Sequence, residues 1–341
     1  EDWQINYQED FGRNHARYFD ASGWLYFTQE YFDLFYPRYG DTYPIFNGAI
    51  GMTHEQAGHG IAGALFQTKN KKVLRISDRI AHHTTTALST IETAVRLKSN
   101  LVRMQGRFFT DEEPEDYAAF LYAPDSGLQL TKELSDLLMK NGFNFYCGAQ
   151  LEGTKVQRQA ISSSSESGSY TIQAHDILIP TQQFNTKLLK VLMQLNPHLK
   201  DTATYDITAW GIPHAFGHFY GLKTFNSGNA QNGPCAESFF KNKLGNSMSY
   251  AYILELSSLQ DYKILSHLMQ KGLNARIAEQ AFTISGNDYS EGTVVFMQAD
   301  QEDNEEHIKL LNSAPLETVT TGWTEKGPDL GSDAFKLLAP S

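Results

Sequence analysis

The stretches "LMKNGFN" (residues 138–144) and "LMQKGLN" (residues 268–274) are near copies of each other. Each opens with apolar residues typical of the end of an amphipathic helix. Each then contains a glycine, Gly142 or Gly272, at a position where helices commonly end in a left-handed residue. Each stretch therefore predicts a helix that stops at the glycine and is followed by a strand. An internal repeat of this kind sets the architecture of a chain.

The similarity extends on both sides of these stretches. "AAFLYAPDSGLQLTKELSDLLMKNGFNFYCGAQ" (118–150) can be laid over "YAYILELSSLQDYKILSHLMQKGLNARIAEQ" (250–280), with an apolar strand before each helix. Each copy continues into a hairpin-like stretch, a second apolar strand and a second helix. The strands are "DILIP" (176–180) and "TVVFMQ" (293–298), and the helices are "FNTKLLKVLMQ" (184–194) and "EEHIKLLNSA" (305–314). We predict two repeated α/β modules, residues 106–235 and 236–341, with the serine run 162–165 as a loop tip.

Composition limits the classes of protein to consider. At 341 residues the chain exceeds the size that one hydrophobic core usually serves. A net charge of −11, without a basic cluster, argues against nucleic acid as a partner. No apolar run approaches the ~20 residues of a membrane-spanning helix, so no membrane span is expected. The two cysteines, Cys147 and Cys235, are too few for a disulfide framework or a cysteine zinc site, and they do not fix the redox compartment.

The first hundred residues are rich in aromatic side chains. Trp24–Phe27 predicts a strand, and the Pro- and Gly-punctuated segment 32–44 predicts an irregular loop. "RIAHHTTTALSTIETAVRL" (79–97) predicts an amphipathic helix, because its apolar residues recur at helical spacing: Ile80, Ala87, Leu88, Ile91, Ala94 and Val95. The charged segment after it predicts a domain end near residue 105, which makes residues 1–105 the first domain.

The stretch "GMTHEQAGHG" (51–60) resembles the H-E-x-x-H zinc motif with one residue too many. His54 and His59 are five residues apart, which on a helix would place their rings roughly 140° apart. The flanking glycines also disfavour a helix here. We therefore interpret both histidines as polar residues at a strand end and its loop. Glu55, between them, is the residue of interest.

"FDLFYPRYGDTYPIFNGAIGMTHEQAG" (32–58) resembles the catalytic-glutamate segment of large multidomain bacterial zinc carboxypeptidases of the carboxypeptidase A family. The resemblance covers about residues 11–100. It implies that residues 1–105 are the C-terminal part of a mixed-sheet α/β peptidase domain. It also implies that Glu55, on a strand, is the general base and acid of peptide-bond hydrolysis at a free C-terminus. Tyr36, or as second choice Tyr39, would close over the peptide substrate, and Asp41 would line the pocket for its C-terminal side chain.

The resemblance also implies zinc in the parent protein and a periplasmic or extracellular location. Family members hold zinc with an H-x-x-E pair and a third histidine, all well upstream of the glutamate. Only His15 precedes His54 here, and its setting "GRNHARYFD" predicts a helix. The chain therefore looks like a fragment that starts after the zinc ligands. We expect it to hold no metal and to be inactive alone.

The remaining histidines favour structural roles. His214 and His218 in "HAFGH" are four apart and would chelate an ion only on a continuous helix, which the nearby glycines make uncertain. His82 and His83 are adjacent, so their side chains diverge on a helix. The alternative function is a non-catalytic binding or scaffold protein, whose repeated modules bind a glycan, a peptide or a partner chain. The sequence leaves the oligomeric state open.

Overall fold

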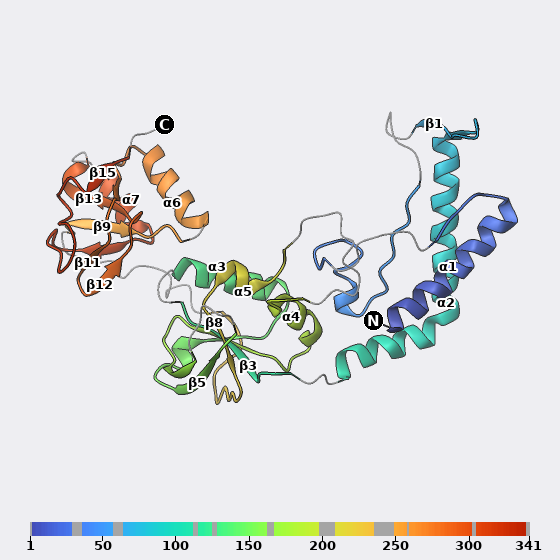
Figure 1. Ribbon diagram of the computed structural model, residues 1–341, viewed down its shortest axis with the longest axis horizontal. Coiled ribbons are helices and arrows are strands. Elements are labelled where there is room, and N and C mark those ends of the chain that lie inside the picture. The colour runs from blue at the N-terminus through green and yellow to red at the C-terminus, as the bar shows by residue number, and fades with distance from the viewer. Residues whose placement is uncertain are drawn as a thin grey trace. The chain divides into compact units, whose positions relative to one another are not determined.

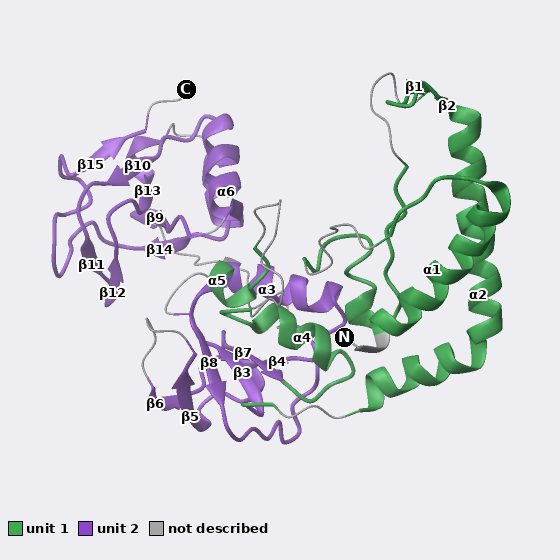
Figure 2. Cartoon of the chain, turned by 45° about the vertical axis from the view of Figure 1, so that its right-hand side comes forward, with its two compact units in different colours: residues 1–116, 181–215 green, residues 117–180, 216–341 purple. Residues whose placement is uncertain are grey.

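The computed structural model describes residues 2–28, 36–56, 64–111, 115–124, 128–161, 167–197, 209–234, 249–257, 259–301 and 305–338. Its helices and antiparallel sheets confirm the α/β class predicted from the sequence (Figure 1). The chain divides into two compact units, residues 1–116 with 181–215 and residues 117–180 with 216–341 (Figure 2). His59, the serine run 162–165 and Cys235 lie outside the described residues.

The first unit is built mainly from helices. Its elements are α1 (Asp2–Ser22), η1 (Ile45–Asn47), β1 (Leu65–Gln67), β2 (Val73–Arg75), α2 (Ile76–Thr110), α4 (Thr186–Met193) and α5 (Ile212–Phe216). α2 confirms the helix predicted over 79–97 and continues through residue 105, where the sequence predicted a domain end. The strand predicted at Trp24–Phe27 is wrong, because these residues follow α1 as irregular chain without a β partner. The loop prediction is confirmed for residues 36–44, which form successive turns.

α1 and α2 lie against each other (Figure 2). Polar side chains join the two helices. Asn14 Nδ2 donates to Ser89 Oγ at 2.9 Å, and Arg17 donates to both carboxylate oxygens of Glu92 at 3.0 and 2.7 Å. On this face of α2 the side chains of Ser89 and Thr93 are fully buried. Because these buried hydroxyls have partners, the contact satisfies their hydrogen bonds.

The apolar stripe of α2 is exposed. Ile80 is 59% exposed, Leu88 58%, Ile91 60% and Val95 69%. A helix of a folded domain usually buries such a stripe and exposes its polar face. α2 does the opposite: it buries its polar face and exposes its apolar stripe. The described part of the first unit therefore leaves this apolar surface uncovered.

The first module contains a six-stranded sheet in the order β4-β7-β3-β8-β5-β6, with every neighbouring pair antiparallel. Along the chain, α4 connects β7 to β8. The strand predicted at 176–180 and the helix predicted at 184–194 are confirmed. The remaining elements are β3 (Ala119–Tyr122), α3 (Leu128–Lys140), β4 (Tyr146–Cys147), η3 (Gly148–Gln150), β5 (Lys155–Ala160), β6 (Gly168–Thr171), β7 (Ile177–Pro180) and β8 (Phe219–Leu222).

The second module repeats this topology. Its sheet has the order β14-β9-β13-β10-β15, so β10-β13-β9-β14 matches β4-β7-β3-β8 strand for strand. Both copies have the β-α-β-β-α-β order of the ferredoxin-like split βαβ unit. The predicted modules, residues 106–235 and 236–341, stay a prediction, and the compact units divide the first of them, because residues 181–215 belong to the first unit. The elements are β9 (Ala251–Leu254), α6 (Leu259–Gln270), β10 (Arg276–Ala278), β11 (Phe282–Ile284), β12 (Asn287–Tyr289), β13 (Val294–Met297), η5 (Gln298–Asp300), α7 (Glu305–Ser313), β14 (Glu317–Val319) and β15 (Phe335–Leu337).

The two glycines that mark the repeat end their helices in the same way. Gly142 has φ of 69° and Gly272 has φ of 88°, both in the left-handed region. The amide of each glycine donates to the carbonyl three residues back, at 3.0 and 2.9 Å. The amide of the next residue donates to the carbonyl five residues back, at 3.0 and 3.2 Å. This is the Schellman arrangement, which satisfies the last carbonyls of a helix and favours glycine.

The sheet of the second module is buried on both faces. On one face, Leu268 of α6 and Leu311 of α7 pack with Phe296 of β13. On the other, Phe282 and Tyr289 of the β11–β12 hairpin stack with ring centroids 5.0 Å apart. The module therefore has a core of its own on each side of its sheet.

Candidate functional site

Glu55 lies in an irregular segment, residues 49–56, that pairs with no strand. The strand implied for it by the resemblance is therefore wrong. α1 holds this segment instead, because Gln4 Nε2 and Gln8 Nε2 both donate to the carbonyl of Gly51, at 2.9 and 2.7 Å. Side-chain amides thus supply the hydrogen bonds that a neighbouring strand would otherwise supply.

The residues on either side of Glu55 are fixed to the helices. The ring of His54 meets the ring of His15 of α1 edge to face, with centroids 4.8 Å apart. Gln56 Oε1 lies 2.7 Å from Nδ1 of His82 of α2. Glu55 itself is exposed and forms no hydrogen bond or ion pair with another described residue. Its carboxylate is therefore held at the surface by neighbours that are anchored.

Asp41 belongs to the turns that precede this segment and is tied to it. Thr53 Oγ1 donates a hydrogen bond to the Asp41 carboxylate. The carbonyl of Asp41 also lies against Gly51, where an added Cβ would come within 2.0 Å of it. The structure thus brings Asp41 next to the Glu55 segment, where it supports the loop. Its predicted role in receiving a substrate side chain stays a prediction.

Tyr36 and Tyr39 lie in the same turn. Their rings meet edge to face with centroids 5.0 Å apart, and the Tyr36 ring lies 6.1 Å from Trp210. Both side chains are half-buried. Since each ring packs on the other, both stay candidates for the tyrosine that closes over a substrate.

Three histidines with lowered pKa values lie in or beside the anchored segment: His54 belongs to it, His15 to α1 and His82 to α2. Burial, with a smaller contribution from His54, lowers the pKa of His15 from 6.5 to about 4. Desolvation and the neighbouring His83 lower the pKa of His54. Desolvation also lowers the pKa of His82, against the opposing charge of Asp78. These groups are therefore uncharged at neutral pH.

This histidine cluster could not be found from the sequence. His15 and His82 were assigned to separate helices and His54 to a loop, and no spacing rule relates them. Ser89 brings the helices together here, since its Oγ lies 2.9 Å from His15 Nδ1 and accepts from Asn14. Only this packing of α1 on α2 shows that the histidines are neighbours.

The described residues do not form a metal site. Among them, no three histidine, cysteine, aspartate or glutamate side chains converge as a metal ion requires. The helical chelate considered for His214 and His218 is excluded, because α5 ends at Phe216 and His218 has a left-handed φ of 51°. His214 Nε2 instead lies 2.7 Å from the carbonyl of Leu195. The zinc implied for the parent protein is therefore not matched by a ligand set in this part of the chain.

Cys147 of β4 is disulfide-bonded. The chain contains one other cysteine, Cys235.

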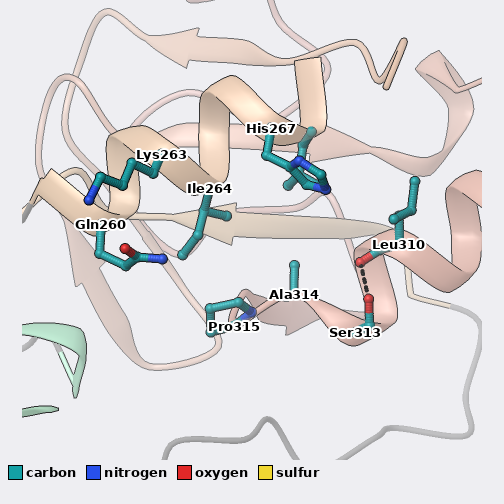
Figure 3. Close-up of a pocket in the computed structure, with 9 residues that line it drawn as sticks. Gln260, Lys263, Ile264, His267, Leu310, Ser313, Ala314 and Pro315 are labelled. Atoms are coloured by element: carbon teal, nitrogen blue, oxygen red, sulfur yellow. Dashed lines mark hydrogen bonds between the residues drawn. The ribbon is translucent and has the colours of Figure 1, made fainter. Parts of the chain in front are cut away.

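A groove of about 380 Å³ lies in the second module, between α6 and the end of α7 (Figure 3). Ile264, Leu310 and Ala314 contribute apolar surface to it. Gln260, Lys263 and His267 line its α6 side. Sequence patterns did not single out these residues, because a groove between two helices depends on how the helices pack.

No protein family, characterised protein or solved structure matches the chain. None of the described helices combines the length and the apolar composition that crossing a membrane requires.

Proposed function

We propose that the chain is part of a zinc carboxypeptidase-like protein that hydrolyses peptide bonds at a free C-terminus. In this proposal Glu55 is the general base and acid, and Tyr36 or Tyr39 closes over the peptide. The observation that carries it is the placement of Glu55. Its neighbours are anchored to α1 and α2, and its own carboxylate is exposed without a described partner. A fixed, accessible carboxylate is what proton transfer to and from a substrate needs.

The exposed stripe of α2 supports a site completed by further polypeptide. Large exposed apolar patches mark surfaces that other protein covers. Leu88, Ile91 and Val95 form such a patch within the unit that carries Glu55. The same polypeptide that covers them would also supply the metal ligands missing from the described residues.

The chemistry assigned to this chain is limited to Glu55. Its carboxylate would accept a proton from the attacking water and donate it to the leaving amine, which requires a peptide within hydrogen-bond reach. The described residues do not include a ligand set for zinc. We expect the chain alone to be inactive.

The proposal extends to location and partners. The substrate is a peptide, and the protein acts in the periplasm or outside the cell. The disulfide at Cys147 supports that location. The acidic net charge of −11 is the reason to propose no nucleic-acid partner.

The test is Glu55→Gln in a protein that joins this chain to the segment with the zinc ligands. We expect turnover of a peptide with a free C-terminus to fall by roughly 10²- to 10⁴-fold, with zinc content unchanged. Glu152→Gln, an exposed glutamate of the first module, is the matched control and should leave turnover unchanged. Full activity in Glu55→Gln would remove Glu55 from the mechanism.

A further inference from the structure

Three buried hydroxyl groups of the first module form no hydrogen bond with the described part of the chain. They belong to Tyr122, the last residue of β3, and to Thr131 and Ser135 in the first half of α3. The side chains of Tyr122 and Thr131 are fully buried, and Ser135 is 2% exposed. A hydroxyl taken out of water without a replacement hydrogen bond destabilises the folded state. Three such groups in one module therefore call for a partner.

The three hydroxyls are neighbours. Thr131 and Ser135 are four residues apart on α3, so their side chains lie on the same face of the helix, one turn apart. Burial raises the pKa of Tyr122 to about 12, and the hydroxyl of Thr131 acts against that rise, which places it beside the phenol. Polar groups that are neighbours without being bonded to each other can be bridged by one small polar molecule.

Threonines on α2 satisfy their hydroxyls locally. Thr86, Thr90 and Thr93 each donate to the carbonyl four residues back, at 2.7, 2.8 and 3.0 Å. Serine and threonine commonly form this bond inside a helix. Thr131 and Ser135 do not form it, although both are buried and helical. Their hydroxyls therefore remain available to another partner.

The second module shows that this fold can be packed without two of these hydroxyls. Tyr122 aligns with Leu254, because β3 pairs with β7 in the register in which β9 pairs with β13. Ser135 aligns with Leu265, because each lies seven residues before the glycine that ends its helix. Leu254 is buried in the apolar core of the second module, and Leu265 packs against that core. At both positions the second module is apolar where the first is polar.

The third position is polar in both modules, but only the second satisfies it from within the chain. Thr131 aligns with Asp261, each eleven residues before the same glycines. The Asp261 carboxylate is also buried, and it accepts from the amide and the hydroxyl of Ser257, each at 3.1 Å. The unpartnered hydroxyls are thus a feature of the first module and not of the shared fold.

We propose that Tyr122, Thr131 and Ser135 bind one water molecule inside the first module, between β3 and α3. Buried water molecules make about three hydrogen bonds to polar groups that lack other partners, which is the number of hydroxyls gathered here. A hydroxyl can donate or accept, so all three can bond to the same water. The bound water joins the end of β3 to α3. The site contains none of the residues assigned to the proposed peptidase function and does not depend on it.

The test removes one hydroxyl at a time from the whole chain, with Tyr122→Phe, Thr131→Val and Ser135→Ala. Hydrogen exchange of the amides of β3 and α3 reports the stability of this site. We expect exchange to be roughly 5- to 30-fold faster in each variant, because the water and the remaining hydroxyls lose a partner. If the hydroxyls bind no water, the sign reverses for Tyr122→Phe. That change would then remove an unpartnered polar atom from the core, and exchange would slow.

A double variant and a control test whether the hydroxyls act through one shared molecule. Tyr122→Phe combined with Thr131→Val should speed exchange by less than the product of the single effects, since both changes act on the same water. Tyr252→Phe breaks a direct bond of 3.0 Å to Asn312 in the second module and should leave exchange of β3 and α3 unchanged. Unchanged or slower exchange in Tyr122→Phe would overturn the proposal.

A crystal structure of the chain separates a bound water from direct bonds between the hydroxyls. We expect one water within hydrogen-bond distance of all three oxygens. Hydroxyls bonded directly to one another, with no water between them, would overturn the proposal. Loss of peptidase activity in Glu55→Gln would not affect it, so the two proposals fail separately.

Discussion

His15 of α1 and His54 of the Glu55 segment meet edge to face with their ring centroids 4.8 Å apart. Burial lowers the pKa of His15 to about 4, and the neighbouring His54 adds a smaller lowering effect. The contact therefore attaches the segment that carries Glu55 to the packed helices α1 and α2. Protonation of His15 in acid should weaken this contact.

Stability should fall with pH between about 6.5 and about 4. The folded pKa of His15 lies below its unfolded value of 6.5, so the unfolded state binds more protons as pH drops. The stabilising effect is therefore fully present above pH 6.5 and lost as pH approaches 4. Urea unfolding at pH 7.5 and pH 5 measures it. His15→Gln should show a smaller pH dependence, whereas His267→Gln, on an exposed position of α6, should retain it.

Lysine at Leu88 and Ile91 should leave the isolated chain folded. Both side chains are already exposed, at 58% and 60%, so their replacement buries no charge. Binding of a hydrophobic dye should fall because the apolar stripe is broken. Thr93→Lys is the contrasting variant, since Thr93 is fully buried and a charge there should cost about 2 kcal/mol or more. If the double variant unfolded as readily as Thr93→Lys, α2 would be packed differently.

Gly272→Ala should destabilise the second module by about 1–2 kcal/mol, the cost of a left-handed backbone for a residue with Cβ. The nearest atom to an added Cβ is Nε2 of His307 at 3.7 Å, so the cost is conformational and not steric. Gly106→Ala in α2 has open space around it and should instead stabilise by roughly 0.5–1 kcal/mol. Denaturant midpoints compare the two. Equal effects would mean that Gly272 is not held in the left-handed region.

The purified chain should contain no stoichiometric zinc. Elemental analysis after dialysis against a weak chelator gives the ratio of zinc to protein. Since no three ligand side chains converge among the described residues, we expect a ratio near zero. One tightly bound zinc per chain would show a ligand set outside the described residues. It would also place the metal of the proposed reaction in this chain.

The repeat could be predicted because its signals are local. A glycine at the end of a helical pattern needs a left-handed φ whatever surrounds it, and both Gly142 and Gly272 adopt one. The strand at 293–298 and the helix at 305–314 are likewise continuous apolar or periodic runs. Trp24–Phe27 has the composition of a strand but no neighbour to pair with, and composition carries no information about a partner.

The sequence by itself determined the duplicated α/β modules, the long helix and the loop before Glu55, because each depends on residues close together in the chain. Only the tertiary structure decided which face of α2 is buried. It also decided the ring contact between His15 and His54 and the hydrogen bond between Thr53 and Asp41. These contacts join separate segments through packing, and no local pattern encodes them. Among the described residues, the stretch around Glu55 is held by such contacts, since amides and rings of α1 and α2 take the place of a neighbouring strand.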